Sequence, residues 1–285
     1  MGKTAMYQKR LTLFIDFLGF KDIVEETAAD NEALNKIVGA LEDAASTAKI
    51  GNKSDFHVSQ FSDCLVISYK VKSADALFEI VNKLSLIVVR IIGRGYLLRG
   101  GLTYGELHHS DTAVLGPAMN RAYYLESEVA KYPRVILDPE VFNELLEDSS
   151  AEVVETIKQV LVKDENDGIW YFDYFSSESV AEKVAGEFDF YPEYLATISG
   201  LIKRGLKHQS VGVLSKYIWM HEHYQSARET FLGAPSDHPA RTKFPGFLES
   251  IEALPSLSRA VTKARDIVAK AAQGKEPPKR KKEKV

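Results

Sequence analysis

Cysteine is almost absent from this chain of 285 residues, since the single thiol is that of Cys64. One cysteine cannot form a disulfide within the chain, which excludes the disulfide-rich domain classes and is typical of a reducing compartment. An apolar signal core is missing from the first ten residues. The longest apolar stretch, LSLIVVRIIG, is interrupted by Arg90 and is too short to cross a bilayer. We therefore expect a cytoplasmic protein without a membrane span.

A strong excess of charge of one sign is also missing. Lys and Arg number 36 against 40 Asp and Glu, which gives a formal net charge of −4 and no general drive toward nucleic acid. Only the last stretch, GKEPPKRKKEKV, is strongly basic, and its prolines and charges without apolar anchors predict a disordered basic tail over 273–285. The sequence GxxxxGK[ST] does not occur, which argues against an ordinary P-loop NTPase.

The periodicity of apolar residues predicts a mixed architecture. Strands are expected over 11–20, over a hairpin at 56–70, over a glycine-rich pair of strands at 96–109 and over 169–175. Helical spacing is found over 20–50, 73–95 and 116–132. Because the hairpins are short, we predict an α/β sandwich over residues 1–180, with a mostly antiparallel sheet flanked by helices. Leu and Ile then recur at helical spacing, which predicts a C-terminal helical extension over 181–272.

Two carboxylates stand out against this pattern. Asp16 lies in the apolar run LTLFIDFLGF, and a buried acid is costly unless it is paired or holds a metal. Asp63 lies at the bend of the hairpin that follows the first helix. In a βαββ unit these strands are neighbours, so the two carboxylates can meet at one sheet edge, where a divalent cation would relieve their repulsion. The alternative is that Asp16 caps a turn and Asp63 is an ordinary hairpin residue.

A possible phosphate site follows directly on the first strand. Gly19 opens the turn from this strand into a helix, and backbone N–H groups at such a turn bind anions. A pair of metal-binding acids beside a phosphate-binding turn is the arrangement that phosphoryl or nucleotidyl transfer requires.

Five motifs, in the correct order from about residue 8 to 177, resemble the class III nucleotide cyclase domain. They are LFIDFLGFKDIV, FSDCLVIS, LLRGGLTYGEL, GPAMNRAYYLE and IWYFDYF. The helical C-terminal extension and the segment AYYLES look like the Pycsar-type bacterial pyrimidine cyclases. That resemblance implies synthesis of cyclic UMP or cyclic CMP as a signal in antiphage defence, with UTP slightly ahead of CTP as the substrate.

The resemblance also implies a role for individual residues. Two Mg²⁺ or Mn²⁺ ions would be held by Asp16, Asp63 and the carbonyl group of Phe17. One ion would activate the ribose 3′-hydroxyl and the other would bind the triphosphate. The remaining matched positions form the phosphate turn, orient the ribose and bind the triphosphate: Leu18, Gly19 and Phe20 for the turn, Asn120 for the ribose and Lys163 for the triphosphate. Asn120 would come from the partner subunit, which implies a homodimer with its sites at the interface.

The departures from the family pattern concern base recognition and an arginine. Ser59 and Ala113 stand where purine cyclases of this class have their adenine-reading lysine and aspartate. Tyr124 replaces the arginine of the asparagine helix, so Arg121 and Arg99 are the candidates for that role, and Arg99 could also donate to a uracil carbonyl. Two alternatives remain: a purine cyclase with unusual base contacts, and a catalytically silent cyclase-like protein that binds nucleotides or acts as a scaffold.

Other polar residues receive no catalytic role from the sequence. His108 and His109 are adjacent and are expected in a loop, and they lack the spacing of a zinc site. Cys64 lies beside Asp63 in a strand and is expected to be a small core residue.

Overall fold

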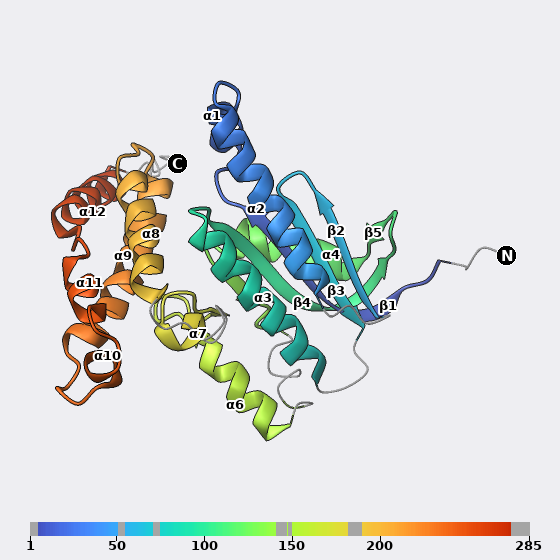
Figure 1. The fold of residues 1–285 in the computed structure, drawn as a ribbon. Helices are drawn as coiled ribbons and strands as arrows, with labels where there is room; N and C mark the ends of the chain where they lie inside the picture. The colour runs from blue at the N-terminus through green and yellow to red at the C-terminus, as the bar shows by residue number, and fades with distance from the viewer. Residues whose placement is uncertain are drawn as a thin grey trace, which may run out of the picture.

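The computed structural model describes residues 5–50, 55–70, 75–140, 147, 150–181 and 190–274. Most of the predicted basic tail, from residue 275 on, lies outside the described residues. Figure 1 shows a sheet flanked by helices, with the C-terminal helices gathered beside it. The predicted mixed α/β architecture, with a mostly antiparallel sheet and C-terminal helices, is confirmed.

The sheet has eight strands in the order β2-β3-β1-β4-β6-β8-β7, and β5 pairs with β4 beside this path. All pairs are antiparallel except β4 with β6, which run parallel. The strands are β1 (Gln8–Phe17), β2 (Phe56–Phe61), β3 (Cys64–Lys70), β4 (Leu98–His109), β5 (Val114–Leu115), β6 (Val135–Leu137), β7 (Leu161–Lys163) and β8 (Trp170–Phe172).

Helices cover both faces of the sheet. The first part of the chain forms α1 (Phe20–Thr27), α2 (Asn31–Lys49), α3 (Asp75–Gly93), α4 (Pro117–Tyr124), the π-helical turn η1 (Leu125–Val129), α6 (Ala151–Val160) and α7 (Ser177–Ala181). The C-terminal helices are α8 (Tyr191–Gly205), α9 (Val211–Leu232), α10 (Pro239–Thr242), α11 (Phe247–Ala253) and α12 (Ser258–Gln273). Helices α2 and α3 lie on one face and α4 lies on the other (Figure 1).

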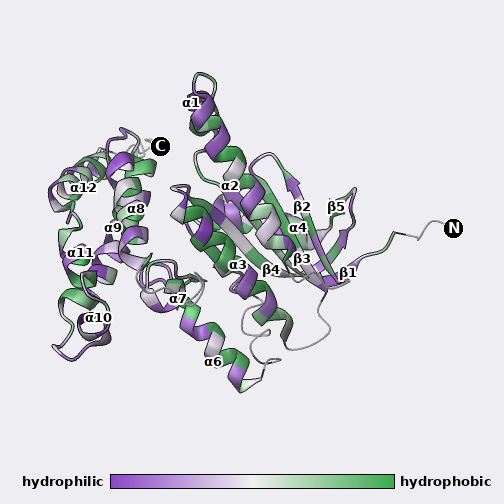
Figure 2. Cartoon of the chain, in the orientation of Figure 1, coloured by the Kyte–Doolittle hydropathy of each residue, from purple (hydrophilic) through white to green (hydrophobic). Residues whose placement is uncertain are grey.

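The strand β1 is central and almost wholly buried because helices cover it from both sides. Leu11, Leu13 and Ile15 pack into the main core under α2 and α3, whereas Phe14 packs on the opposite face with Val66. Helix α2 begins after Asp30, whose carboxylate accepts hydrogen bonds from the backbone N–H groups of Glu32 and Ala33 and so caps the first turn. Figure 2 shows mostly hydrophobic residues along α3, which lies between the sheet and other helices.

The glycine-rich segment differs from its prediction as a pair of strands. It forms the single twelve-residue strand β4, and none of Gly100, Gly101 and Gly105 has a positive φ that would start a turn. These glycines instead allow a close approach. A Cβ atom on Gly101 would lie 2.5 Å from the Leu125 Cβ and 3.0 Å from the Ala122 carbonyl oxygen. The sequence pattern therefore reflects tight contact between the sheet and α4–η1.

We expect Gly101→Ala to lower the free energy of unfolding by about 1–3 kcal/mol, because the new methyl group overlaps the backbone of α4 and the side chain of Leu125. Urea unfolding followed by circular dichroism measures this change. Gly105→Ala is the matched control on the same strand, since its Cβ would meet the nearest atom at 3.4 Å, an ordinary contact. Equal destabilisation by both substitutions would contradict this account of the glycines.

The C-terminal helices are joined to the sheet through a buried guanidinium. Arg134, 1% exposed, binds the Asp164 carboxylate at 2.5 Å and also pairs with Asp167. Trp219 of α9 donates its indole N–H to the same Asp164 carboxylate at 2.7 Å and stacks on Tyr132 with ring centroids 5.1 Å apart. The guanidinium of Arg134 lies 5.7 Å from the Trp219 ring centroid. Helix α9 thus closes a polar cluster that begins in the sheet.

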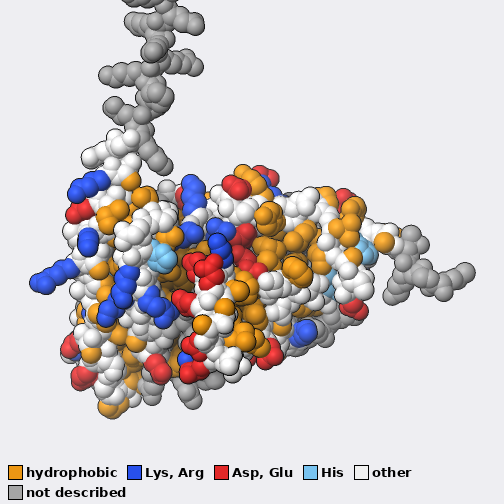
Figure 3. All heavy atoms as spheres, turned by 90° about the horizontal axis from the view of Figure 1, so that it is seen from above, with side chains coloured by type: hydrophobic (Ala, Val, Ile, Leu, Met, Phe, Trp, Pro, Cys, Tyr) orange, Lys and Arg blue, Asp and Glu red, His pale blue; other side chains and the backbone are white. Residues whose placement is uncertain are grey.

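Among the described residues, no helix combines the length and the apolar character needed to cross a membrane. Figure 3, the view from above, shows a hollow between the C-terminal helices and the rest of the molecule, with acidic and basic side chains gathered beside it.

Candidate active site

The carboxylates of Asp16 and Asp63 converge at one edge of the sheet, as the sequence predicted. Asp16 is the penultimate residue of β1, and Asp63 lies in the tight turn between β2 and β3, where Ser62 has a φ of 54°. Asp16 pairs in register with Cys64, the first residue of β3. One ligand atom from each of Asp16, Asp63 and Cys64 lies within 4.8 Å of the others. This spacing allows one ion to touch both acids.

Burial and crowding of negative charge strongly perturb Asp16. Burial, together with the neighbouring carboxylates of Asp63 and Glu126, raises the pKa of Asp16 to about 7, although a hydrogen bond from Cys64 opposes the shift. A carboxyl group with such a pKa carries a proton for part of the time near neutral pH. A bound cation would replace that proton and relieve the same repulsion.

The third member of this cluster is a thiol and not a thiolate. The Cys64 Sγ donates to Asp16 Oδ1 at 3.3 Å, and burial beside the acids raises the pKa of Cys64 to about 12. The metal ligands available are therefore hard carboxylate oxygens, which suit Mg²⁺ or Mn²⁺ better than a soft metal. Asp16 and Asp63 fit such an ion and leave room in its shell for phosphate oxygens.

An arginine and a buried glutamate complete this edge. Arg99 of β4 lies directly opposite Asp16 in the ladder and donates from Nε to Glu126 Oε1 at 2.6 Å. Glu126 is 3% exposed and lies in the π-helical turn η1, which closes with an Ala130 N–H to Leu125 carbonyl hydrogen bond of 2.8 Å. Sequence reasoning missed Glu126, because a regular helix gives no signal that this residue turns inward. Arg99 therefore lies between Asp16 and Glu126, beside the acidic residues of the site.

Helix α9 brings a second cation that the sequence did not indicate. Lys216 is partly buried and lies within electrostatic range of both Arg99 and Glu126, and burial lowers its pKa. One turn further along α9, Trp219 is held against Tyr132, which follows η1 in the chain. The helical extension therefore reaches the edge of the sheet where the acids lie.

The predicted phosphate turn lies beside the acids. Its backbone and side-chain groups differ in whether they could contact a phosphate. The side chain of Phe17 is 3% exposed in the core, so only its backbone can serve the site. The Leu18 N–H is used by the Leu97 carbonyl at 2.8 Å. Gly19 has a φ of 76° and caps α1, and a Cβ there would meet no atom within 4 Å. Open space thus lies beside Gly19, directly before the first turn of α1, which begins with Phe20.

Helix α4 carries the predicted ribose and arginine positions. Asn120 is exposed, in keeping with a residue that would serve another subunit. Arg121 is held by Asp138, with hydrogen bonds of 2.9 and 2.7 Å, and also pairs with Glu140 at 3.0 Å. Tyr124 is exposed beneath that guanidinium. Arg121 is therefore tied to a buried carboxylate, whereas Arg99 is the arginine beside Asp16.

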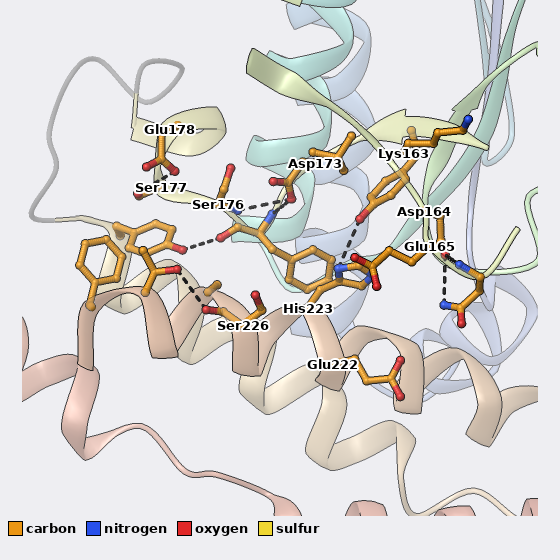
Figure 4. A pocket seen from close by; sticks show the side chains of 18 residues that line it. Lys163, Asp164, Glu165, Asp173, Ser176, Ser177, Glu178, Glu222, His223 and Ser226 are labelled. Carbon is orange, nitrogen blue, oxygen red and sulfur yellow. Dashed lines mark hydrogen bonds between the residues drawn. The ribbon is translucent and has the colours of Figure 1, made fainter. Parts of the chain in front are cut away.

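The structure places Lys163 far from the acids of its own chain. Lys163 lies in β7, four strands away from β1, which corresponds to roughly 19 Å. It borders a cavity of about 530 Å³ between the β7–β8 turn and α9, shown in Figure 4. The labelled side chains around it include Glu165, Glu178, Glu222 and His223, and the imidazole of His223 accepts or donates a 3.3 Å hydrogen bond with Tyr171. An acidic cavity of this kind repels phosphates, so Lys163 does not complete the phosphate site within one chain.

Ser59 lies on the same face of the sheet as Asp16. It faces Val66 across the β2–β3 ladder, and Val66 in turn faces Phe14 of β1, two residues before Asp16. The Ser59 hydroxyl is hydrogen bonded to His109 Nε2 at 2.9 Å. His109 was predicted in a loop but is the last residue of β4 and is 7% exposed. Ala113 contributes only backbone hydrogen bonds to Ser110.

No family model and no curated protein matches this chain. The interpretation of the site therefore depends on its geometry and on the motifs in the sequence.

Proposed function

We propose that this protein is a pyrimidine nucleotide cyclase, which converts UTP, or CTP, into the 3′,5′-cyclic monophosphate and pyrophosphate. In this reaction the ribose 3′-oxygen forms a bond to the α-phosphorus, the bond from the α-phosphorus to the bridging oxygen breaks, and the 3′-hydroxyl loses its proton. The convergence of the Asp16 and Asp63 carboxylates at a sheet edge, beside the open turn at Gly19, carries the proposal. A role in antiphage signalling follows only from the sequence resemblance.

Each group of residues at the site would have its own role in the proposed reaction. Asp16, Asp63 and the Phe17 carbonyl would hold two Mg²⁺ or Mn²⁺ ions, which supply positive charge to the reacting phosphate and hydroxyl oxygens. Arg99 and Lys216 add positive charge at the same edge, where the leaving pyrophosphate gathers negative charge. The turn at Gly19 offers backbone N–H groups to the phosphates.

A second copy of the chain would complete the site. Asn120 and Tyr124 are exposed on α4, and large apolar side chains lie uncovered near the acids: Phe61 is 84% exposed and Tyr123 is 55%. Phe61 faces Cys64 across the ladder, and Tyr123 packs edge-on against Phe14 of β1, with ring centroids 5.7 Å apart. An exposed apolar surface around a polar site is typical of a subunit interface. A homodimer would bring Asn120 of one subunit to the acids of the other.

The test is to incubate the purified protein with each of the four labelled ribonucleoside triphosphates and Mg²⁺ or Mn²⁺, and to separate the products. We expect one cyclic pyrimidine nucleotide and pyrophosphate, with product lost on chelation of the metal. A cyclic purine product would identify a purine cyclase. No cyclic product under any of these conditions would overturn the proposal and favour a silent nucleotide-binding or scaffold protein.

A further inference from the structure

The hairpin formed by α8 and α9 carries positive charge without any acid over a long stretch. Residues 194–221 contain no Asp or Glu, in a chain whose formal net charge is −4. Four basic residues of this stretch form what we call the basic tip: Lys203, Arg204, Lys207 and Lys216. The first three are exposed, at the end of α8 and in the turn after it, and Lys216 is partly buried in the second turn of α9. Figure 3 shows Lys and Arg side chains gathered on the C-terminal helices beside the hollow.

The α8 arm of the hairpin lies beside the turn at Gly19. Arg204 donates from its guanidinium to the Gly95 carbonyl oxygen at 3.4 Å. Two residues further along the chain, the Leu97 carbonyl accepts the hydrogen bond of the Leu18 N–H at 2.8 Å. The end of α8 is therefore placed next to the segment that holds the phosphate turn in position.

The α9 arm passes the same turn. The ring of Tyr217 packs against Gly205, where a Cβ atom would lie 2.1 Å from the ring, so the two arms are in close contact. The Tyr217 hydroxyl is within electrostatic range of Asp22 in the first turn of α1. The Asp22 N–H in turn donates to the Gly19 carbonyl at 3.0 Å. Both arms of the hairpin thus border the open space beside the phosphate turn.

Lys216 is the member of the basic tip that lies nearest to the acids. Trp219 fixes this part of α9, because its ring stacks on Tyr132 with ring centroids 5.1 Å apart. Residues three apart are neighbours on the surface of a helix, so Lys216 lies one turn before Trp219 on the same side of α9. Its ammonium group is within electrostatic range of both Arg99 and Glu126.

Lys216 differs from Arg99 in having no carboxylate partner. Arg99 donates to Glu126 Oε1 at 2.6 Å, so its guanidinium is held in place. Lys216 forms no ion pair with any carboxylate in the part of the chain that the structure describes. A partly buried ammonium beside a second cation is unfavourable by itself, and a bound anion would relieve both the desolvation and the repulsion.

The position of the basic tip suits the end of a nucleotide that carries most of its charge. With the reacting α-phosphate at Asp16 and Asp63, the β- and γ-phosphates extend toward the turn at Gly19 and the hairpin beside it. The other candidates for these phosphates are poorly placed. Lys163 borders an acidic cavity four strands away from β1, and Tyr124 carries no positive charge.

We propose that Lys216 binds the β- and γ-phosphates of the nucleotide and stabilises the pyrophosphate as it leaves, so that the C-terminal helices are part of the catalytic unit. This inference rests on the proposed cyclase function. It assigns the leaving-group end of the site to a helix outside the cyclase-like segment, which covers residues 8 to about 177. Lys216 keeps its protons during the reaction and acts by its charge and its hydrogen bonds.

The first experiment needs no turnover. Isothermal titration calorimetry measures the affinity of the protein for pyrophosphate in the presence of Mn²⁺. We expect Lys216→Met and Lys216→Gln each to weaken binding about tenfold or more, because a charge-assisted hydrogen bond is lost. Lys216→Arg keeps the charge and should bind within about threefold of wild type. The matched control is Lys263→Met, which removes an exposed charge from α12 and should bind as the wild type does.

Thermal unfolding of the same variants shows whether a loss of binding reflects a damaged fold. Folded Lys216→Met and Lys216→Gln proteins with the pyrophosphate affinity of the wild type would overturn the inference. A wild type that binds no pyrophosphate in the presence of Mn²⁺ would overturn it as well.

The second experiment measures kcat and KM for UTP. We expect Lys216→Met to lower kcat about 10²-fold and to change KM much less, because the charge on the pyrophosphate grows in the transition state. Lys216→Arg should recover most of the lost rate. An active wild type whose kcat is unchanged in Lys216→Met would overturn the inference and leave the cyclase function intact. A wild type that cyclises no nucleotide would instead remove the proposed function, and with it the role of Lys216 in the reaction.

Discussion

Replacement of Asp63 by asparagine is expected to lower the rate of nucleotide cyclisation by about 10³-fold or more, while the protein remains folded. The change removes one of two carboxylates that would hold the ions, and metal charge at a reacting phosphate contributes several kcal/mol to the barrier. The substitution preserves the size of the side chain in a partly exposed turn, so the fold has little reason to change. Turnover with UTP and Mn²⁺, together with thermal unfolding, measures both effects.

A matched control is Glu42→Gln, which removes an exposed carboxylate from α2 on the other side of the sheet. It should leave turnover within about twofold of wild type, as expected for a surface substitution remote from the reaction. Near-normal turnover in Asp63→Asn would refute the metal assignment. Loss of turnover accompanied by unfolding would point to a structural role for the hairpin turn.

Mixing variants tests whether two subunits share each site. Asp63→Asn and Asn120→Ala should each be inactive, because each lacks one half of both sites in a homodimer. A mixed dimer contains one site with an intact Asp63 from one subunit and an intact Asn120 from the other. Random exchange of subunits should therefore restore about a quarter of the wild-type rate. No recovery despite subunit exchange would show that Asn120 does not act across the interface.

Replacement of Asp16 by asparagine should also abolish turnover, but it should stabilise the metal-free protein at alkaline pH. The pKa of Asp16 is about 7 in the folded protein and 3.8 in the reference state. Between these values the native state binds more protons than the unfolded chain, so the stability of the wild type falls as the pH rises through this window. Asparagine carries no charge and escapes this loss.

We compare the free energy of unfolding of Asp16→Asn with that of the wild type, with chelator present. The amount by which the variant is more stable should be about 2 kcal/mol larger at pH 8 than at pH 5. Urea unfolding at the two pH values measures this difference, and the comparison cancels the opposite contribution of His109, whose lowered pKa costs stability as the pH falls. Added Mg²⁺ or Mn²⁺ should raise the melting temperature of the wild type and not that of the variant. A stability difference between the variant and the wild type that does not change with pH would contradict the raised pKa of Asp16.

The meeting of Asp16 and Asp63 was predictable because each position carries a local signal. An acid in a buried apolar strand is unfavourable by itself, and an acid at a hairpin bend has a defined place at the end of a sheet. The antiparallel order of the strands, read from short hairpins, then places both at one edge. The mostly antiparallel sheet and the C-terminal helices were predictable for the same reason, since the period of apolar residues is a local property.

The other parts of the site depend on contacts between distant segments. Glu126 turns inward through a π-helical turn, and Lys216 reaches the acids only because α9 docks on the sheet. The prediction of His109 in a loop was wrong because the glycines of β4 do not end the strand; they allow close packing, and the strand continues to His109. The match of Lys163 depends on its distance along the chain from the last strand, and the strand order separates it from Asp16.

The way in which Trp219 closes over Arg134 has a consequence for handling the protein in pieces. The change in composition suggests a domain boundary near residue 180. A fragment ending there would lack Trp219, which would expose the Tyr132 ring and leave Asp164 without its indole donor. The buried guanidinium of Arg134 would then face water on one side. Expression of the amino-terminal portion by itself is therefore a poor route to a stably folded protein. Any shortened version should keep the chain at least through α9.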